Sequence, residues 1–267
     1  MGLAFLRLYD ATGGRRYFDY ARGYADSLID ADGNIFKYRM DNYNLDQVNP
    51  GKMMFILHDL TSDPRYEKVI QTLYRQLQDQ PRIAEGGFWH KMVYPDQMWL
   101  DGLYMGAPFY AEYALRYNRP DDFSDVVNQF LVVASHTYDP ATGLYRHAFD
   151  ASGKMAWADS VTGQAPHAWG RAMGWFTMAI VDVLDFLPRD QPGRDELTGI
   201  LQGIVNKLSE IQDPATGGWY QVPDRSGAEG NYIETSCTAM FAYSIFKGVR
   251  MGYLDGKYLA VAEKAYL

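Results

Sequence analysis

The sequence predicts an all-α protein built from stacked helical hairpins, and two features support this prediction. Segments whose apolar residues recur at helical spacing alternate along the 267 residues with short stretches rich in glycine. Four of the turns inside the helical pairs also resemble one another, because each places a turn cluster before an aromatic residue that begins the next helix. The repeats are longer and less uniform than those of most α-solenoids, so we favour a closed α/α barrel over an open solenoid.

Five helical pairs can be read in chain order. They are 3–11 with 16–29, 45–60 with 64–79, 100–117 with 121–137, 171–187 with 194–212, and 236–253 with 256–267. Pro64 suits the first turn of its helix, where its missing N–H is not needed. No linker divides the chain, so we expect one domain over residues 1–267.

Four similar stretches follow helical pairs. They cover residues 30–38, 84–91, 139–147 and 213–221. Their Gly turns and alternating aromatic residues predict short strands or extended loops. In a barrel such long loops gather at one end, where we expect the ligand site.

Composition argues against several classes of function. The net charge is −8 without a Lys/Arg run, which disfavours nucleic acids and anionic membranes as partners. No run of 18 apolar residues predicts a membrane span. The single cysteine, Cys237, cannot form an intramolecular disulfide or a cysteine-based zinc site. The first residues do not form a signal peptide, so we expect a cytoplasmic location.

Residues 86–110, GGFWHKMVYPDQMWLDGLYMGAPFY, combine aromatic, acidic and basic side chains. Asp101 is expected in the first turn of a helix, where the helix dipole stabilises a carboxylate. Its neighbours would exclude water from it and favour the protonated acid near neutral pH. These neighbours are Trp99, Leu100, Leu103 and Tyr104. A helix cap explains the same residue, so this segment leaves a catalytic and a capping role open.

Asp46, in the stretch NLDQVNPGKMM (44–54), is expected to open a helix in a similar way. Two acids at equivalent points of successive hairpins would face the same end of a barrel. Paired carboxylates are the usual equipment of glycoside hydrolases. Two helix caps are the alternative.

Arg171 lies in the stretch WADSVTGQAPHAWGRAMGW (157–175), and a helix would place Trp175 one turn after it. A guanidinium can bind the carboxylate of an acidic sugar through two hydrogen bonds. A structural ion pair with a nearby aspartate is the alternative. Weaker candidates on loops are His147, Asn231 and Glu234.

Three of these stretches, residues 86–114, 45–51 and 168–175, closely resemble the unsaturated rhamnogalacturonyl hydrolases of glycoside hydrolase family 105. The resemblance runs from Leu3 to the C-terminus. It implies an all-α, six-hairpin (α/α)6 barrel. Because only five hairpins can be read, we expect this barrel to be incomplete, with helices missing at both ends.

The family removes a terminal 4,5-unsaturated galacturonic acid left by a pectin lyase. The resemblance therefore implies a small acidic oligosaccharide as substrate and no metal or organic cofactor. It implies that Asp101, in WLDG, is the general acid/base and that Asp46, in LDQ, is the second functional aspartate. The further residues that it assigns to the sugar site are His90, Lys91, Trp99, His147, Trp169, Arg171 and Trp175.

The implied reaction is hydration of a vinyl ether rather than ordinary glycoside hydrolysis. A proton adds at C4 and water at C5, and the hemiketal then opens and releases the next sugar. One carboxylic acid could donate the proton and afterwards activate the water. Two other functions stay open: an unsaturated glucuronyl hydrolase acting on another lyase product, and a sugar-binding fragment without turnover.

Overall fold

A computed structural model describes residues 1–267, which form ten α-helices and two small two-stranded sheets. The predicted all-α class is confirmed. The chain divides into two compact units, residues 1–81 with 91–93 and residues 82–90 with 94–267. The expectation of a single domain stays a prediction. None of the helices is long and apolar enough to cross a membrane.

The first unit contains two helical hairpins. They are α1 (Gly2–Thr12) with α2 (Arg15–Ser27), and α3 (Gly51–Thr61) with α4 (Pro64–Asp79). Helix α1 also packs on α3, at a point where Gly2 has no side chain to collide with Met53. Asp63 caps α4 by accepting a hydrogen bond of 3.0 Å from the N–H of Arg65, and Pro64 occupies the first turn as predicted.

The helix predicted over residues 45–60 begins later than expected. Leu45–Gln47 form a short 3-10 helix, η2, and α3 starts only at Gly51. Pro50 explains the difference, because it has no N–H to donate and its ring disfavours the helical conformation at Asn49. Asp46 therefore lies in η2, and the expectation that it opens the long helix is wrong.

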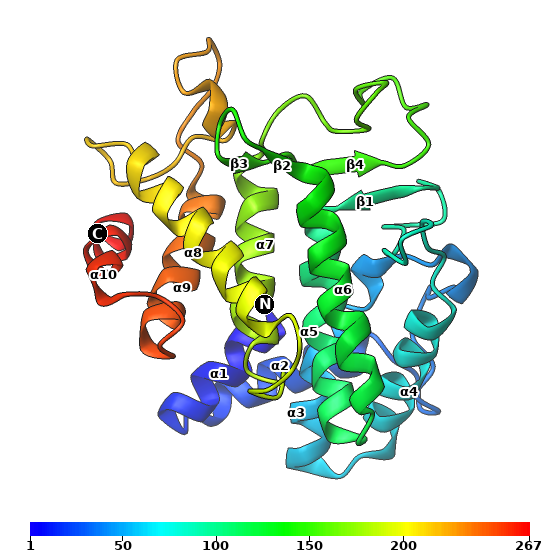
Figure 1. The fold of residues 1–267 in the computed structure, drawn as a ribbon. Coiled ribbons are helices and arrows are strands. Elements are labelled where there is room, and N and C mark those ends of the chain that lie inside the picture. The colour runs from blue at the N-terminus through cyan, green and yellow to red at the C-terminus, as the bar shows by residue number, and fades with distance from the viewer. The chain divides into compact units, whose positions relative to one another are not determined.

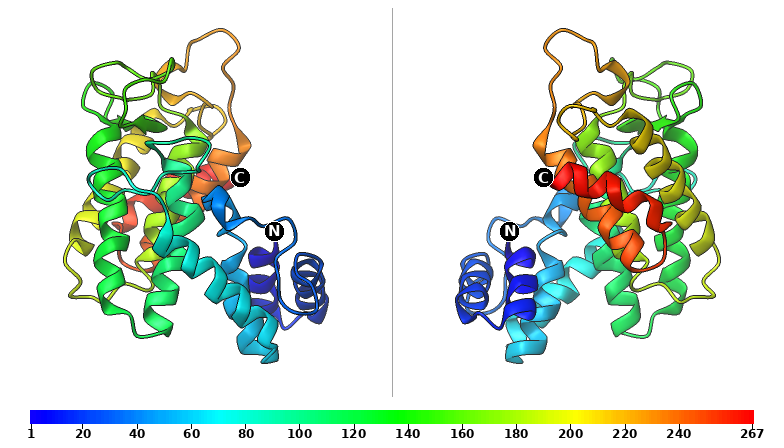
Figure 2. Two further views of the ribbon diagram at one scale, coloured as in Figure 1. Left: turned by 90° about the vertical axis from the view of Figure 1, so that its right-hand side faces the viewer. Right: turned by 90° about the vertical axis from the view of Figure 1, so that its left-hand side faces the viewer.

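The second unit contains three helical hairpins. They are α5 (Leu100–Arg116) with α6 (Pro120–Thr137), α7 (Gly170–Val183) with α8 (Arg194–Ile211), and α9 (Thr235–Arg250) with α10 (Leu259–Tyr266). Helix α7 packs against both α5 and α9, and each of these three helices packs against its hairpin partner (Figures 1 and 2). Glycines permit the close contact of α7 with α9, since a Cβ at Gly174 would lie 2.7 Å from the sulfur of Met240.

Two short antiparallel sheets lie at the end of this unit where α5, α7 and α9 begin (Figure 1). Strand β1 (Gln97–Trp99) pairs with β4 (Ala148–Asp150), and β2 (Tyr138–Asp139) pairs with β3 (Leu144–Tyr145). The long loops of the unit gather at the same end, as the sequence predicts. The free N–H groups of three helix N-termini are directed toward these loops.

The four recurrent stretches after the helical pairs form tight turns. Each contains a glycine with positive φ: Gly33 (76°), Gly86 (88°), Gly143 (73°) and Gly217 (74°). Glycine adopts this conformation without steric cost, because it has no Cβ atom. Short antiparallel pairs flank the first three turns, so the prediction of short strands or extended loops is confirmed.

Candidate active site

Helices α5 and α7 begin in the same way. Trp99 and Trp169 are their N-cap residues, both in an extended conformation, and a charged residue follows two positions later in each case. These charged residues are Asp101 and Arg171. Helical side chains tilt toward the N-terminus, so both are directed toward the loop end of the second unit. The partial positive charge of packed helix N-termini suits an anionic ligand at this end.

Asp101 is half-buried in the first turn of α5, and its Oδ2 atom is inaccessible to solvent. The N-cap position of α5 belongs to Trp99, so the alternative that Asp101 is merely the N-cap does not hold. The packing at the helix end therefore shields this carboxyl oxygen from water.

Six aromatic side chains form a contiguous group at the N-terminal ends of α5 and α7, which we call the aromatic cluster. Its members are His90, Tyr94, Trp99, His147, Trp157 and Trp169. Trp99 stacks on His90 at 4.8 Å between ring centroids and on Tyr94 at 5.1 Å. The cluster unites four of the residues predicted to line the sugar site.

His147 lies at the centre of the aromatic cluster. Its ring meets Trp99 at 6.0 Å and Trp169 at 6.1 Å, edge to face in both cases, and Trp157 at 6.1 Å. Burial lowers the pKa of His147 below its usual value, because the charged imidazolium loses hydration among these rings. The ring is therefore neutral at pH 7.

Arg171 is held by contacts on two sides. Its Nη1 atom donates a hydrogen bond of 2.8 Å to Oε1 of Glu234, the buried N-cap residue of α9. Its guanidinium carbon lies 4.4 Å from the centroid of the Trp169 ring. The Arg171 side chain remains 39% exposed, so its other N–H groups can reach a ligand.

One expectation and one alternative for Arg171 need correction. The ring beneath it is Trp169 rather than Trp175, because a helical side chain tilts back toward the preceding turn. Trp175 stacks instead on Tyr104 of α5, with 4.6 Å between ring centroids. The anionic partner is Glu234, which is distant in sequence, rather than a nearby aspartate.

In the first unit, two of the predicted site residues lie in direct contact. Lys91 Nζ is 2.6 Å from Oδ2 of Asp46, whose side chain is 43% exposed. Asn44 accepts a hydrogen bond of 3.0 Å from the N–H of Asp46 and so fixes the 3-10 turn that carries it. That Asp46 and Asp101 act in one site stays a prediction.

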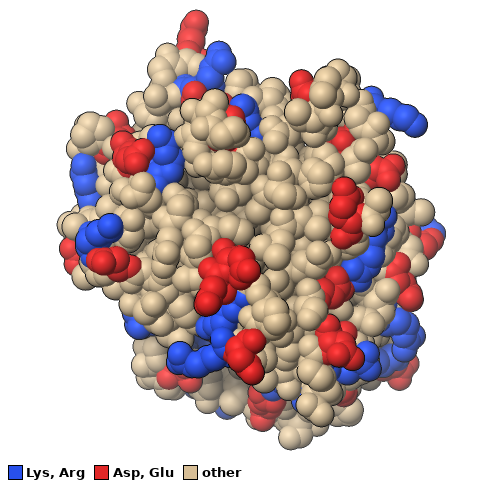
Figure 3. All heavy atoms as spheres, viewed as in Figure 1, with Lys and Arg blue, Asp and Glu red and all other residues tan.

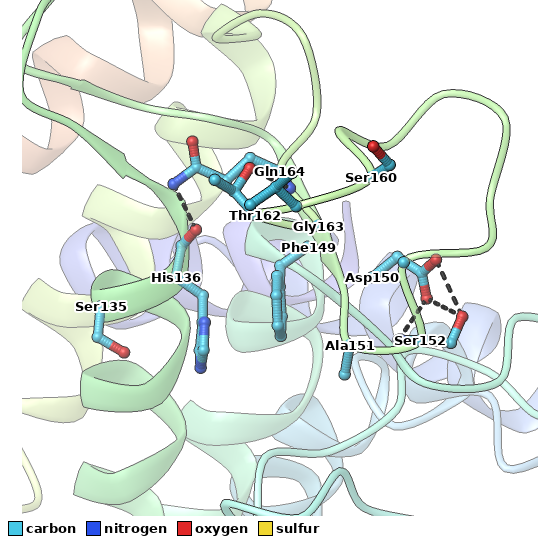
Figure 4. Close-up of a pocket in the computed structure, with 12 residues that line it drawn as sticks. Ser135, His136, Phe149, Asp150, Ala151, Ser152, Ser160, Thr162, Gly163 and Gln164 are labelled. Atoms are coloured by element: carbon cyan, nitrogen blue, oxygen red, sulfur yellow. Dashed lines mark hydrogen bonds between the residues drawn. The ribbon is translucent and has the colours of Figure 1, made fainter.

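A cavity of about 530 Å³ lies between the end of α6, strand β4 and the loop 151–164, and none of the predicted site residues lines it (Figure 4). Asp150 organises this loop by accepting hydrogen bonds from the N–H groups of Ser152, Lys154 and Met155. Burial alone would raise the pKa of Asp150, but these hydrogen bonds hold it below its usual value. The same loop carries Trp157 to its contact with His147.

Sequence reasoning did not single out Tyr94 or Trp157, it expected Tyr104 only to shield Asp101 from water, and it named Glu234 as a weaker candidate. Tyr94 and Tyr104 stand inside the segment already singled out for its density of aromatic residues, and Trp157 opens the stretch that ends at Trp175.

Acidic and basic side chains are interspersed over the face of the protein shown in Figure 3. On that face, basic side chains alternate with acidic ones rather than covering the surface alone.

Comparisons with known proteins identify the family of the chain. The family model Glycosyl Hydrolase Family 88 matches residues 2–267. A solved glycoside hydrolase of family 105 from C. acetobutylicum ATCC 824 is 40% identical, with a TM-score of 0.96 over 98% of this chain and 73% of that chain. The all-α hairpin fold implied by the resemblance is confirmed by this likeness.

Two curated relatives are also similar in sequence. The 24.9 kDa protein in the picA locus of Rhizobium radiobacter is 39% identical over 164 residues, which cover 60% of this chain and 68% of that protein. The unsaturated rhamnogalacturonyl hydrolase YesR of Bacillus subtilis is 27% identical over 275 residues, which cover 100% of this chain and 74% of that protein. The chain is therefore a glycoside hydrolase, which belongs to family 88 by its family match and to family 105 by its likeness to the C. acetobutylicum enzyme.

Proposed function

We propose that the protein removes a terminal 4,5-unsaturated galacturonic acid from unsaturated rhamnogalacturonan oligosaccharides. One observation carries the proposal: the packing of α5 on α7 brings an aspartic acid and a half-exposed arginine, each in a first helical turn, beside one aromatic cluster. The name of the YesR relative supports the same substrate class. A role in pectin degradation and a cytoplasmic location are predictions that accompany this proposal.

Arg171 binds the carboxylate of the unsaturated sugar through the N–H groups that Glu234 does not occupy. Its position over the Trp169 ring fixes the plane of the guanidinium. The aromatic cluster excludes water from the sugar, which strengthens the charge–charge contact.

Asp101 supplies the proton. It protonates C4 of the vinyl ether while positive charge develops at C5 beside the ring oxygen. As a carboxylate, it then accepts a proton from the water that attacks C5, which restores the acid. The C5 hemiketal opens to a ketone and leaves a hemiacetal at C1. This hemiacetal collapses to an aldehyde and releases the next sugar as an alcohol. One water is consumed for each glycosidic bond broken.

Loss of the ultraviolet absorbance of the C4–C5 double bond tests the proposal. We expect decay with an unsaturated rhamnogalacturonan disaccharide, and we expect the product formed in D₂O to carry deuterium at C4 by NMR. Decay with an unsaturated glucuronyl disaccharide alone would assign the protein to that other activity. Binding of both disaccharides by the folded protein without decay of either would contradict hydrolysis.

A further inference from the structure

His167 and Asp224 form a contact that the mechanism above does not use. His167 Nδ1 lies 3.0 Å from Oδ2 of Asp224, which belongs to the short helix η3 (Pro223–Arg225). The Asp224 side chain is only 6% exposed, whereas that of His167 is 43% exposed. Asp224 is thus the anchored partner, and the imidazole is the partner that a ligand can reach.

Arg146 fixes this pair in place. Its Nη1 atom lies 3.6 Å from Oδ2 of Asp224, and its Nη2 atom donates a hydrogen bond of 2.7 Å to Asp139. It also donates to the carbonyl oxygen of Pro166, the residue before His167. These ionic contacts hold the Asp224 carboxylate and the backbone before His167 in one arrangement, so the carboxylate can orient the imidazole.

The backbone register places His167 opposite His147, a member of the aromatic cluster. Arg146 pairs with Ala168 in an antiparallel bridge, and the N–H of Ala165 donates to the carbonyl oxygen of Ala148. The segment 165–168 therefore contains one extra residue, so Pro166 and His167 together lie opposite His147. Opposed residues of an antiparallel pair share one face, and that face of His147 meets Trp169.

We propose that His167 determines specificity by hydrogen-bonding a hydroxyl group of the sugar to which the unsaturated uronate is attached. The inference rests on the proposed function, because it assigns the uronate itself to Asp101 and Arg171. Asp224 is a positioning residue: it accepts the Nδ1–H of His167, which leaves Nε2 as an acceptor for a sugar hydroxyl.

Two substrates test the proposal: the unsaturated rhamnogalacturonan disaccharide, and the methyl glycoside of 4,5-unsaturated galacturonic acid, which lacks the second sugar. The readout is the ratio of kcat/KM for the disaccharide to kcat/KM for the methyl glycoside. One lost hydrogen bond corresponds to about a tenfold change, so we expect His167→Ala to lower this ratio by about tenfold. His167→Gln, which keeps a side-chain acceptor, should restore part of the ratio.

Asp224→Asn should lower the same ratio by a smaller factor, because the imidazole stays but its tautomer is no longer fixed. His58→Ala is the matched control, since His58 lies in the last turn of α3 in the first unit. An unchanged ratio in His167→Ala, with the wild type active on both substrates, would overturn the role of His167. A wild type inactive on both substrates would instead refute the proposed function.

Discussion

The Nη1 atom of Arg171 donates a hydrogen bond of 2.8 Å to Oε1 of Glu234, which joins the first turn of α7 to the N-cap of α9. Ser236 donates to the same carboxylate oxygen at 2.6 Å, and the other oxygen, Oε2, is buried without a hydrogen-bond partner. The carboxylate therefore engages one edge of the guanidinium and leaves the remaining N–H groups for the substrate.

Replacing Glu234 should weaken substrate binding more than it slows the chemical step. We expect Glu234→Gln to raise KM by about tenfold and to change kcat by less than about threefold, because Arg171 loses the charged acceptor that orients it. Steady-state kinetics on the unsaturated disaccharide checks this. Glu229→Gln, at an exposed loop glutamate, is the control. An unchanged KM in Glu234→Gln would show that Glu234 does not position Arg171.

Asp46 and Lys91 allow a separate test of the second predicted acid. If Asp46 acts on the substrate, Asp46→Asn should lower kcat by about a hundredfold or more, within the range typical of a lost acid–base group. Asp41→Asn is a matched control, because Asp41 also forms an exposed ion pair, with Arg39 at 2.9 Å. Equal activity of the two variants would show that Asp46 does not act on the substrate. Its contact with Lys91 would then be a surface ion pair, which contributes little to stability.

The helical hairpins were predictable because helical periodicity and turn chemistry are local signals. Pro64 and the positive-φ glycines, such as Gly143, mark element boundaries by their own backbone preferences. The late start of α3 at Gly51 was misjudged, since the apolar pattern continues through Leu45 although Pro50 interrupts the helix.

The contacts of the site were less predictable because they join residues distant in sequence. Arg171 and Trp169 were singled out from one short stretch, but the Glu234 contact depends on how α9 packs against α7. Likewise, the link between Trp157 and His147 depends on the course of the loop 151–164, which no periodic pattern encodes. Residue types indicated which chemistry to expect, whereas tertiary packing determined the partners.

The neutral state of His147 should make stability depend on pH. Its pKa is lowered in the folded protein, so below the unfolded value of about 6.5 the unfolded chain binds the proton more readily. The free energy of unfolding should therefore decrease as the pH falls from about 7 through 6.5 toward the folded pKa. The His147→Asn variant should lack this pH dependence of the free energy of unfolding. Urea unfolding of both proteins at several pH values measures the difference. Parallel pH profiles for the two proteins would contradict the assignment.

Asp150 should be required for the order of the loop 151–164. Asp150→Asn weakens several hydrogen bonds to loop N–H groups, and we expect a loss of about 1–3 kcal/mol in the free energy of unfolding. Because the pKa of Asp150 is lowered on folding, this stabilisation is present above the unfolded value of about 3.9 and is lost as the pH falls through the folded pKa.

Limited proteolysis and urea unfolding check the Asp150 prediction, with cleavage expected between residues 151 and 164. Asp159→Asn is the control, since Asp159 makes its side-chain hydrogen bonds only to Val161 and Thr162 of the same turn. Equal protease resistance of Asp150→Asn and the wild type would show that other contacts hold the loop.

The role of Asp101 is tested most directly by the decay of double-bond absorbance in Asp101→Asn with unsaturated rhamnogalacturonan disaccharide. Asp96→Asn is the matched control, because Asp96 precedes the same helix and its positive φ of 60° is readily adopted by asparagine. We predict that Asp101→Asn lowers kcat by about a thousandfold while folding as the wild type does, and that Asp96→Asn stays active. A kcat for Asp101→Asn within about threefold of the wild type would contradict the assignment of Asp101 as the acid/base.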